Sequence, residues 1–327
     1  MKLYGLVLGK FLPPHAGHIH LCEVAQRMCD ELFIVVGTLA GEPIPSERRY
    51  EWMRELMPRA TVLHLTEELP QQPSEHPEFW RLWREALGKT LGGIRPHLVF
   101  SSDAYGEQLA AELGGQWIPV DPARATFPIS GTAIRAAPMR HFALLPRCVR
   151  PYYTRRVSVF GPESTGKSTL AAELAAALHT RRVPEFARDY LESRHGVLDP
   201  GDLPLIARGQ IALEDALARD ADRVLICDTD PLLTVVWHEA LYGAAPDWLR
   251  ARAARRRYAL TLLCDVDLPW VADSVRYLPD DRAGFFARCE QALRDADRPY
   301  LIVRGNGPDR GQPALARVRA LLTDEEP

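Results

Sequence analysis

The stretch GPESTGKST, residues 161–169, decides the fold of the second half of this 327-residue chain. It has the spacing G-x-x-x-x-G-K-S and lies between the apolar run VSVF and the helix-forming run TLAAELAAAL. In that setting, the backbone N–H groups of the turn and the positive end of the following helix form a nest for an anion. A phosphate-binding loop between a strand and a helix predicts a parallel α/β domain.

Two side chains of this loop have direct tasks in phosphate chemistry. Lys167 can reach the β- and γ-phosphates of ATP, and the Ser168 hydroxyl can hold Mg²⁺. The remaining loop residues are expected to surround the phosphates, which adds Gly161, Glu163, Ser164, Thr165, Gly166 and Thr169 to the ATP site. We therefore expect a P-loop kinase that uses ATP as co-substrate and Mg²⁺ as cofactor.

Apolar runs that alternate with helical spacing extend from this loop in both directions. Strands are expected at 3–9, 31–38, 60–65 and 97–102 in the first half, and at 155–161, 223–230, 258–267 and 299–305 in the second. Runs that are apolar on both faces and separated by helices predict parallel sheets.

The length of the chain and a break in its pattern predict two domains. The segment 136–156 holds prolines and arginines but no strand pattern, and a chain of this length can form two cores. We predict α/β domains at 1–150, with a Rossmann-like parallel sheet, and at 151–327, with the parallel sheet of a P-loop kinase.

Composition excludes several classes of protein. Charged residues make up 25% of the chain and the net charge is −3, so no general basic surface for nucleic acid is expected. No apolar run is long enough to cross a membrane, and Lys10 interrupts the first apolar run too early for a signal peptide. The six cysteines lack CxxC pairs, which disfavours zinc knuckles and disulfides. We expect a cytoplasmic protein with reduced cysteines and no membrane partner.

Carboxylates near the expected strand ends are candidates for the acceptor site of the kinase. Asp228 and Asp230 end the run RVLICDTD, where a parallel sheet would place them beside the phosphates, with Asp228 on the metal side. The segment VPEFARDYLE supplies Glu185, Arg188 and Asp189, a cluster suited to bind sugar hydroxyls and to activate one of them. The same cluster could instead form charge pairs along an exposed helix.

A third segment of the second half, DLPWVADSVRYLPDDR at 267–282, combines arginines with an aromatic residue. Arginines at this position could close over the transferring phosphate and neutralise its charge. A solvated loop is the alternative interpretation. The candidate residues are Trp270, Asp273, Arg276 and Arg282.

In the first half, the stretch GKFLPPHAGHIH at 9–20 places Lys10, His15 and His18 around the expected start of a helix. A metal site would need further ligands, and no second cluster is found in the sequence. The helix start favours anion binding instead. The H-x-G-H arrangement resembles the signature of the nucleotidyltransferase superfamily, which transfers a nucleotidyl group from ATP or CTP and releases pyrophosphate. This resemblance places Gly9, Phe11 and Gly17 in the ATP site.

The resemblance implies a second motif, I-S-x-T-x-x-R, and PISGTAIR at 128–135 supplies it. In such a transfer a phosphate monoester attacks the α-phosphate, so positioning and charge neutralisation are needed rather than a protein base. We expect Ser130 and Thr132 to contact ATP. The expected catalytic residues of the first half are Lys10, His15, His18 and Arg135.

The two domains in this order resemble the NadR family, which joins a nicotinamide mononucleotide (NMN) adenylyltransferase to a C-terminal ribosylnicotinamide kinase. The resemblance rests on GKFLPPHAGH, PSERRYEWMREL, SSDAYG, ISGTAIR, GPESTGKST, EFARDYLE, CDTD and DLPWVADSVR. It implies that the second domain phosphorylates nicotinamide riboside with ATP and that the first converts the resulting NMN to NAD. Homo-oligomer formation is left open.

The same resemblance assigns roles to individual residues. Asp103 and Tyr105 match a segment that lines the nucleotide site of the first domain. Trp80 and Trp83 could stack on a nicotinamide ring or could be core residues. Catalytic roles in the second domain fall to Lys167, Asp189 and Asp228, and substrate contacts to Glu185, Arg188, Asp230, Trp270, Asp273, Arg276 and Arg282, with Trp237 as a further stacking candidate.

The chain departs from the family pattern in two places. Some members begin with a DNA-binding helix-turn-helix, whereas the first strand is expected here from Leu3, so DNA binding is not expected. The kinase segment reads Asp273-Ser274-Val275-Arg276 in place of D-G-x-R. Two alternatives remain: a kinase whose first domain only senses nucleotides, or the same two folds acting on another nucleoside and its monophosphate.

Overall fold

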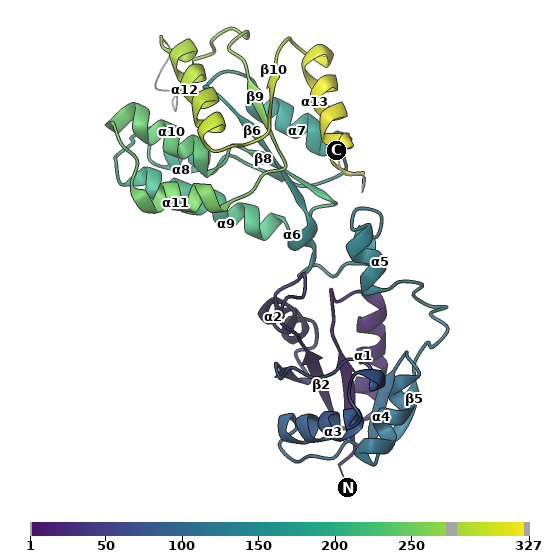
Figure 1. Ribbon diagram of the computed structural model, residues 1–327. Coiled ribbons are helices and arrows are strands. Elements are labelled where there is room, and N and C mark those ends of the chain that lie inside the picture. The colour runs from purple at the N-terminus through teal and green to yellow at the C-terminus, as the bar shows by residue number, and fades with distance from the viewer. Residues whose placement is uncertain (1, 273–279, 324–327) are drawn as a thin grey trace. The chain divides into compact units, whose positions relative to one another are not determined.

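The computed structural model describes residues 2–272 and 280–323. The chain divides into two compact units, residues 1–149 and 150–327, each built on its own sheet (Figure 1). Both sheets have five strands, and every pairing is parallel. The predicted fold class, two parallel α/β domains, is thereby confirmed. None of the helices in the described ranges has the length and hydropathy needed to span a membrane.

In the first unit the strand order is β3-β2-β1-β4-β5. The strands are β1 (Tyr4–Gly9), β2 (Glu31–Gly37), β3 (Thr61–Leu65), β4 (Leu98–Ser101) and β5 (Gln116–Pro119). The chain leaves the central strand β1 toward β2 on one side and returns to β4 on the other. The loops after β1 and β4 therefore border one crevice at the carboxyl edge of the sheet.

Helices cover both faces of this sheet. The cluster that contains Leu21, Cys22 and Met53 packs α1 (Ala16–Met28) and α2 (Ser46–Leu56) on one face. The cluster that contains Leu87 and Leu109 packs α3 (Phe79–Thr90) and α4 (Tyr105–Leu113) on the other. The unit also contains α5 (Gly131–Ala136) and two short 3₁₀ turns, Pro73–Glu75 and Phe142–Leu144.

The second unit repeats this design with the strand order β10-β9-β6-β8-β7. Its strands are β6 (Arg155–Phe160), β7 (Arg182–Val183), β8 (Val224–Asp228), β9 (Leu260–Cys264) and β10 (Tyr300–Val303). The central strand β6 pairs with β8 on one side and β9 on the other. The loop that follows β6 therefore lies at the point where the strand order reverses, the usual ligand position in such sheets.

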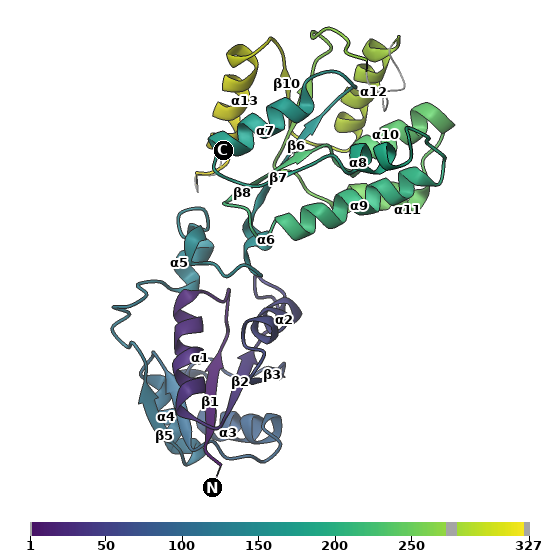
Figure 2. The ribbon, with the colours of Figure 1, turned by 180° about the vertical axis from the view of Figure 1, so that it is seen from behind.

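The helices of the second unit also form two layers. Figure 2 shows α13 (Pro308–Ala320) beside α7 (Lys167–Ala177), and both pack on β6 and β9 through Val159, Leu170 and Val318. On the other face, α10 (Pro231–Tyr242) and α12 (Arg282–Asp295) share a cluster with Phe160 and Phe285. The remaining helices are α6 (Arg150–Tyr153), α8 (Phe186–Ser193), α9 (Asp202–Leu217) and α11 (Asp247–Arg255).

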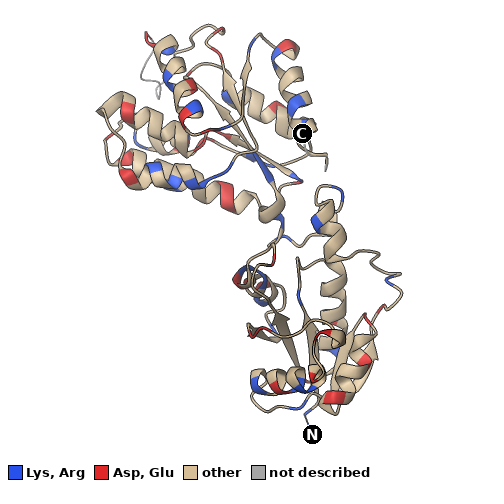
Figure 3. Ribbon diagram, viewed as in Figure 1, with Lys and Arg blue, Asp and Glu red and all other residues tan. Residues whose placement is uncertain are grey.

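Charges of both signs are interspersed on the helices of each unit (Figure 3), in line with the small net charge. Many form ion pairs along one helix, such as Arg81 with Glu85 on α3, and Arg81 also pairs with Glu78, the N-cap residue of that helix. The six cysteines are free, and all but Cys29 are buried.

Candidate functional sites

The P-loop lies between β6 and α7, as its sequence context predicts. The backbone has positive φ angles at Gly161 (130°), Ser164 (56°) and Gly166 (73°). A Cβ atom on Gly161 would lie 2.8 Å from the carbonyl oxygen of Cys264, so only glycine lets the loop pass the end of β9. Lys167 is 9% exposed, and its ammonium donates to the carbonyl of Pro162 at 2.8 Å. The ammonium thus lies over its own loop.

A cavity of about 350 Å³ opens beside this loop. Its polar part is formed by the loop and the start of α8, and its apolar part by side chains of α8, α9 and α10. The predicted residues that line it are Glu163, Ser164, Thr165, Gly166, Lys167, Ser168, Thr169, Glu185 and Arg188, joined by Trp237 and by Leu191, Leu203, Ile206, Gln210 and Leu233.

Two carboxylates approach Lys167 from neighbouring elements. Asp228 ends β8 and is 1% exposed. Its carboxylate accepts a hydrogen bond from the Ser168 hydroxyl, while its Oδ1 atom has no hydrogen-bond partner within the described residues. Glu185 precedes α8. Burial raises the pKa of both carboxyls, although Lys167 opposes the rise in each case. Carboxylate and hydroxyl oxygens are the ligands that Mg²⁺ prefers, so Asp228 and Ser168 fit a magnesium site.

The structure places two other predicted carboxylates elsewhere. Asp230 is fully buried, caps α10 by accepting from the Leu232 N–H at 2.6 Å, and pairs with Arg298 at 2.7 Å. Its oxygens are used within the fold, so Asp230 has a structural role in this structure, and its predicted contact with substrate stays a prediction. Asp189 is exposed on α8 and does not line the cavity, because it lies on the outward face of the helix. Glu185 is the carboxylate of this segment that faces Lys167.

Arg282 connects the P-loop to the segment after β9. It lies at the start of α12 and donates to the carbonyls of Leu268 at 2.9 Å and Ser164 at 3.0 Å. Its guanidinium lies 5.8 Å from the ring centroid of Trp270. Neither residue lines the cavity in this conformation. Asp273 and Arg276 lie outside the described residues.

Sequence reasoning missed Arg310, which supports the P-loop from behind. It belongs to α13, is 5% exposed, and donates to the carbonyl of Thr165 at 2.6 Å, to that of Gly305 at 3.0 Å and to Asp267 at 2.9 Å. The run PDRGQP around it carries no local signal of this role, since its loop partner lies 145 positions earlier.

In the first unit, the two motif histidines form a stacked pair. His15 precedes α1 with extended backbone, and its ring lies 3.8 Å from that of His18. Both Nδ1 atoms are buried and lack a hydrogen-bond partner in the described ranges. Burial, assisted by Arg124, lowers the pKa of His15 to about 4 and that of His18 well below its usual range. Both rings are therefore neutral at pH 7.

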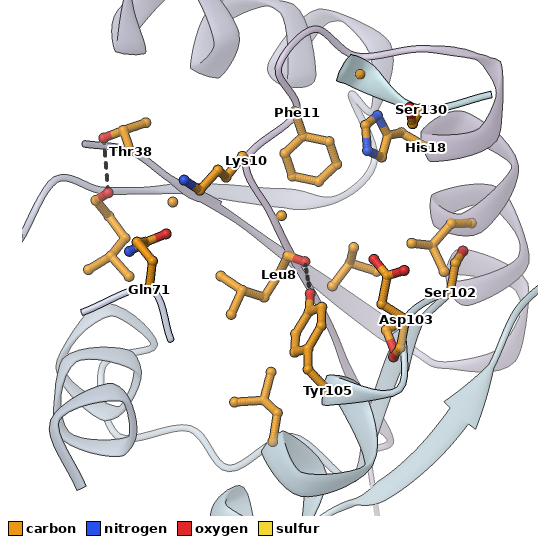
Figure 4. Close-up of a pocket in the computed structure, with 18 of the residues that line it drawn as sticks. Leu8, Lys10, Phe11, His18, Thr38, Gln71, Ser102, Asp103, Tyr105 and Ser130 are labelled. Carbon is orange, nitrogen blue, oxygen red and sulfur yellow. Dashed lines mark hydrogen bonds between the residues drawn. The ribbon is translucent and has the colours of Figure 1, made fainter. Parts of the chain in front are cut away.

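This pair borders a cavity of about 510 Å³ at the carboxyl edge of the sheet. Figure 4 shows Lys10, Phe11 and His18 along one side of it and Asp103 and Tyr105 along another. The predicted residues that line it are Gly9, Lys10, Phe11, His15, Gly17, His18, Trp80, Trp83, Asp103, Tyr105 and Ser130. Sequence reasoning missed Arg124, which also lines the cavity and pairs with Asp103 at 3.0 Å. Among the described residues that line this cavity, the lysine and arginine side chains are those of Lys10 and Arg124.

The second motif of this unit packs directly against the first. A Cβ atom on Gly131 would lie 2.4 Å from the carbonyl oxygen of Leu12, so α5 begins in contact with the histidine loop. Arg135 donates to that same carbonyl at 2.5 Å and to Thr132 at 3.2 Å, and Ser130 caps the helix. Thr132 and Arg135 do not line the cavity in this conformation, because these bonds hold them against the loop.

The two tryptophans of α3 lie between the cavity and the core. Trp80 and Trp83 line the cavity and also pack against the core cluster beneath it. The Trp83 indole N–H donates to the carbonyl of Pro70 at 2.8 Å, which fixes the ring at the cavity wall.

In comparison with known proteins, each half of the chain matches a different family, and two relatives match most of the chain. Residues 6–137 match the family described as cytidylyltransferase-like, and residues 156–310 match the AAA domain. The trifunctional NAD biosynthesis/regulator protein NadR of Escherichia coli K12 is 32% identical over 298 residues, covering 85% of this chain and 72% of that protein. The corresponding protein of Salmonella typhimurium LT2 is 30% identical over 327 residues, covering 93% and 79%.

Solved structures show the same fold. The crystal structure of a NadR protein in complex with NR has a TM-score of 0.81 and 22% identity, covering 98% of this chain and 96% of that one. A NadR protein in complex with NAD and AMP-PNP has a TM-score of 0.79 and 22% identity, covering 100% and 98%. With two relatives at 30% identity or more that it covers over most of their length, the chain belongs to the NadR family.

Proposed function

We propose that the chain is a bifunctional enzyme of NAD biosynthesis. Its second domain would phosphorylate nicotinamide riboside with ATP, and its first would transfer the adenylyl group of ATP to the resulting NMN, giving NAD and pyrophosphate. The observation that carries this proposal is that each unit has its own cavity, lined by its own phosphate-binding motif. Membership of the NadR family supports the choice of substrates.

In the kinase reaction, the P-loop backbone and Lys167 would bind the phosphates of ATP. Ser168 and Asp228 would hold Mg²⁺, which neutralises phosphate charge when bound. Glu185 would accept the proton of the riboside 5′-hydroxyl as that oxygen attacks the γ-phosphorus, and ADP would leave with the electron pair of the broken bond between the γ-phosphorus and the bridging oxygen. Burial raises the pKa of Glu185, which makes its carboxylate a stronger base than an exposed one. The apolar part of the cavity, with Trp237, would receive the nicotinamide ring.

In adenylyl transfer, a phosphate oxygen of NMN would attack the α-phosphorus of ATP, and pyrophosphate would leave with the electron pair of the broken bond. The neutral rings of His15 and His18 can each donate an N–H to the phosphates, while Lys10 and Arg124 neutralise charge. Loss of one such donor typically costs on the order of 10²–10³ in rate. Trp80 and Trp83 would face the nicotinamide ring.

A product assay tests the proposal. The protein is incubated with nicotinamide riboside, ATP and Mg²⁺, and the products are followed by chromatography. NMN should form first and NAD should follow. NMN that never proceeds to NAD would show that the first domain only binds nucleotides, and the absence of both products would overturn the substrate assignment. Nicotinic acid riboside in place of the amide tests the preference between the two forms.

A pair of variants tests which carboxylate serves the kinase. Glu185→Gln should lower kinase kcat by about 10²-fold or more, since a positioned base contributes roughly 10²–10⁴ in rate. Asp189→Asn, which changes an exposed side chain of the same helix, should stay within about two-fold of the wild type. A larger loss from the Asp189 variant would restore the role that the sequence suggested for that residue.

A further inference from the structure

A buried arginine of α2 and a glutamate of the preceding loop connect to Lys10, the lysine of the histidine motif. We propose that Glu42 and Arg49 are positioning residues for Lys10, so that its ammonium is directed to the cavity before nucleotide binds. The inference rests on the adenylyl transfer proposed above. The histidine motif alone does not indicate these two residues, because Glu42 and Arg49 lie more than 30 positions after Lys10.

Arg49 fixes the backbone at the base of the lysine. Its side chain has no exposed surface, and one terminal nitrogen donates to the carbonyl of Lys10 at 2.7 Å and to that of Gly37 at 3.4 Å. These carbonyls lie at the carboxyl ends of β1 and β2. A fully buried guanidinium is unfavourable unless it is paired, and the pairing here joins two strand ends to α2. Arg49 therefore sets where the Lys10 side chain begins.

Glu42 fixes the other end of the lysine. Its carboxylate accepts from the Leu39 N–H at 3.1 Å and from the second terminal nitrogen of Arg49, and its Oε1 atom lies 3.0 Å from the Lys10 ammonium. Burial alone would raise the pKa of Glu42, but the Leu39 N–H, Lys10 and Arg49 together lower it, so the carboxylate is ionised at neutral pH. Its side chain is only 10% exposed.

Lys10 is the most exposed member of this network. Its side chain is 46% exposed, whereas Glu42 is held by two other donors and Arg49 is enclosed. A free lysine samples many rotamers, and restricting them in advance is worth on the order of 10-fold in an equilibrium. Because that restriction exists before the nucleotide arrives, it is expected to act on the rate of the transfer step.

The same contact could instead make Glu42 a competitor that withholds Lys10 from phosphate. The two roles have opposite kinetic signatures. A competitor raises the KM for ATP, so its removal lowers KM; a positioning residue supports kcat, so its removal lowers kcat. The bond from Arg49 to the Lys10 carbonyl favours positioning, since a competitor for the ammonium would not require control of the lysine backbone.

The test uses the full chain and a double-mutant cycle. Glu42→Gln, Lys10→Ala and the double variant are compared for kcat and for the KM of ATP in NAD synthesis from supplied NMN. We expect Glu42→Gln to lower kcat about 10-fold and to change KM less than about three-fold, with no further loss when Lys10 is already alanine. Arg49→Lys, which keeps the charge but cannot reach all three acceptors, should behave like Glu42→Gln.

Two controls keep the outcome interpretable. Phosphorylation of nicotinamide riboside by the same polypeptide should be unchanged, and Glu51→Gln, an exposed position of α2, should behave as wild type. Equal losses from Glu42→Gln with and without the Lys10 side chain, or a lower KM at unchanged kcat, would overturn the inference. A wild-type chain that phosphorylates the riboside but forms no NAD would overturn the proposed adenylyl transfer itself.

Discussion

Replacement of Arg310 by methionine should damage one of the two proposed activities and spare the other. Methionine approximates the length of the arginine stem but removes the charge and all three hydrogen bonds, to Thr165, Gly305 and Asp267. The carbonyl of Thr165 belongs to the turn that would wrap the phosphates of ATP. Without its buried donor, this turn is expected to lose its fixed geometry.

The size of the effect follows from burial. Removing one member of a buried ion pair typically costs about 3–5 kcal/mol. The Asp267 side chain is 31% exposed, so water can solvate it after the change and the cost should lie near about 3 kcal/mol. For a domain of about 180 residues, this lowers the unfolding midpoint by roughly 6–12 °C. The domain should still fold at 25 °C, since domains typically have about 5–15 kcal/mol of stability.

Thermal unfolding and separate assays of the two reactions would measure these effects. The KM for ATP in riboside phosphorylation should rise, while NAD synthesis from supplied NMN should keep its wild-type rate. Arg317→Met, at an exposed position of the same helix, is the matched control. If Arg310→Met and Arg317→Met gave the same midpoint and the same KM for ATP, the support of the P-loop by Arg310 would be refuted.

Three further predictions concern the motifs and the histidine pair. Lys167→Ala should abolish NMN formation yet leave NAD synthesis from NMN intact, and His18→Ala should do the reverse; parallel loss of both reactions in either variant would argue against separate active sites. Gly131→Ala should slow NAD synthesis at least about 10-fold because its Cβ would lie 2.4 Å from the Leu12 carbonyl, with the kinase rate as the control. The folded-state pKa of His15 is about 4, so the first domain should lose stability, on the order of 3 kcal/mol, as pH falls from about 6.5 to 4, where only the unfolded chain gains a proton. A denaturation series across this range measures that loss as the difference between the wild type and His15→Asn, since the variant keeps the separate contribution of His18.

The fold was predictable because long apolar runs mark buried parallel strands. The central strands β1, β2, β6, β8 and β9 were all expected from their sequence. The edge strands β5 and β7 were not, since β5 has four residues ending in a proline and β7 has two. Short edge strands are held by one neighbour and need little hydrophobic sequence of their own.

The candidate sites were predictable where a motif sets the geometry locally, as in the P-loop and the histidine stretch. Contacts between distant segments leave no local pattern in the sequence. Glu42, Arg124 and Arg310 contact residues of the two sites from other loops and helices. The position of a carboxylate after a strand also did not reveal its use. Asp228 faces Ser168, whereas Asp230, two residues later, is taken up by a helix cap and an arginine.

The stacked, uncharged pair of His15 and His18 has a consequence for how the first site responds to its ionic surroundings. Dissolved salt screens the attraction between separated charges but acts little on a hydrogen bond from a neutral ring. Of the cavity-lining residues within 2–272 and 280–323, only Lys10 and Arg124 carry positive charge. Nucleotide binding there should therefore weaken less with rising ionic strength than it would if His15 and His18 were also positively charged.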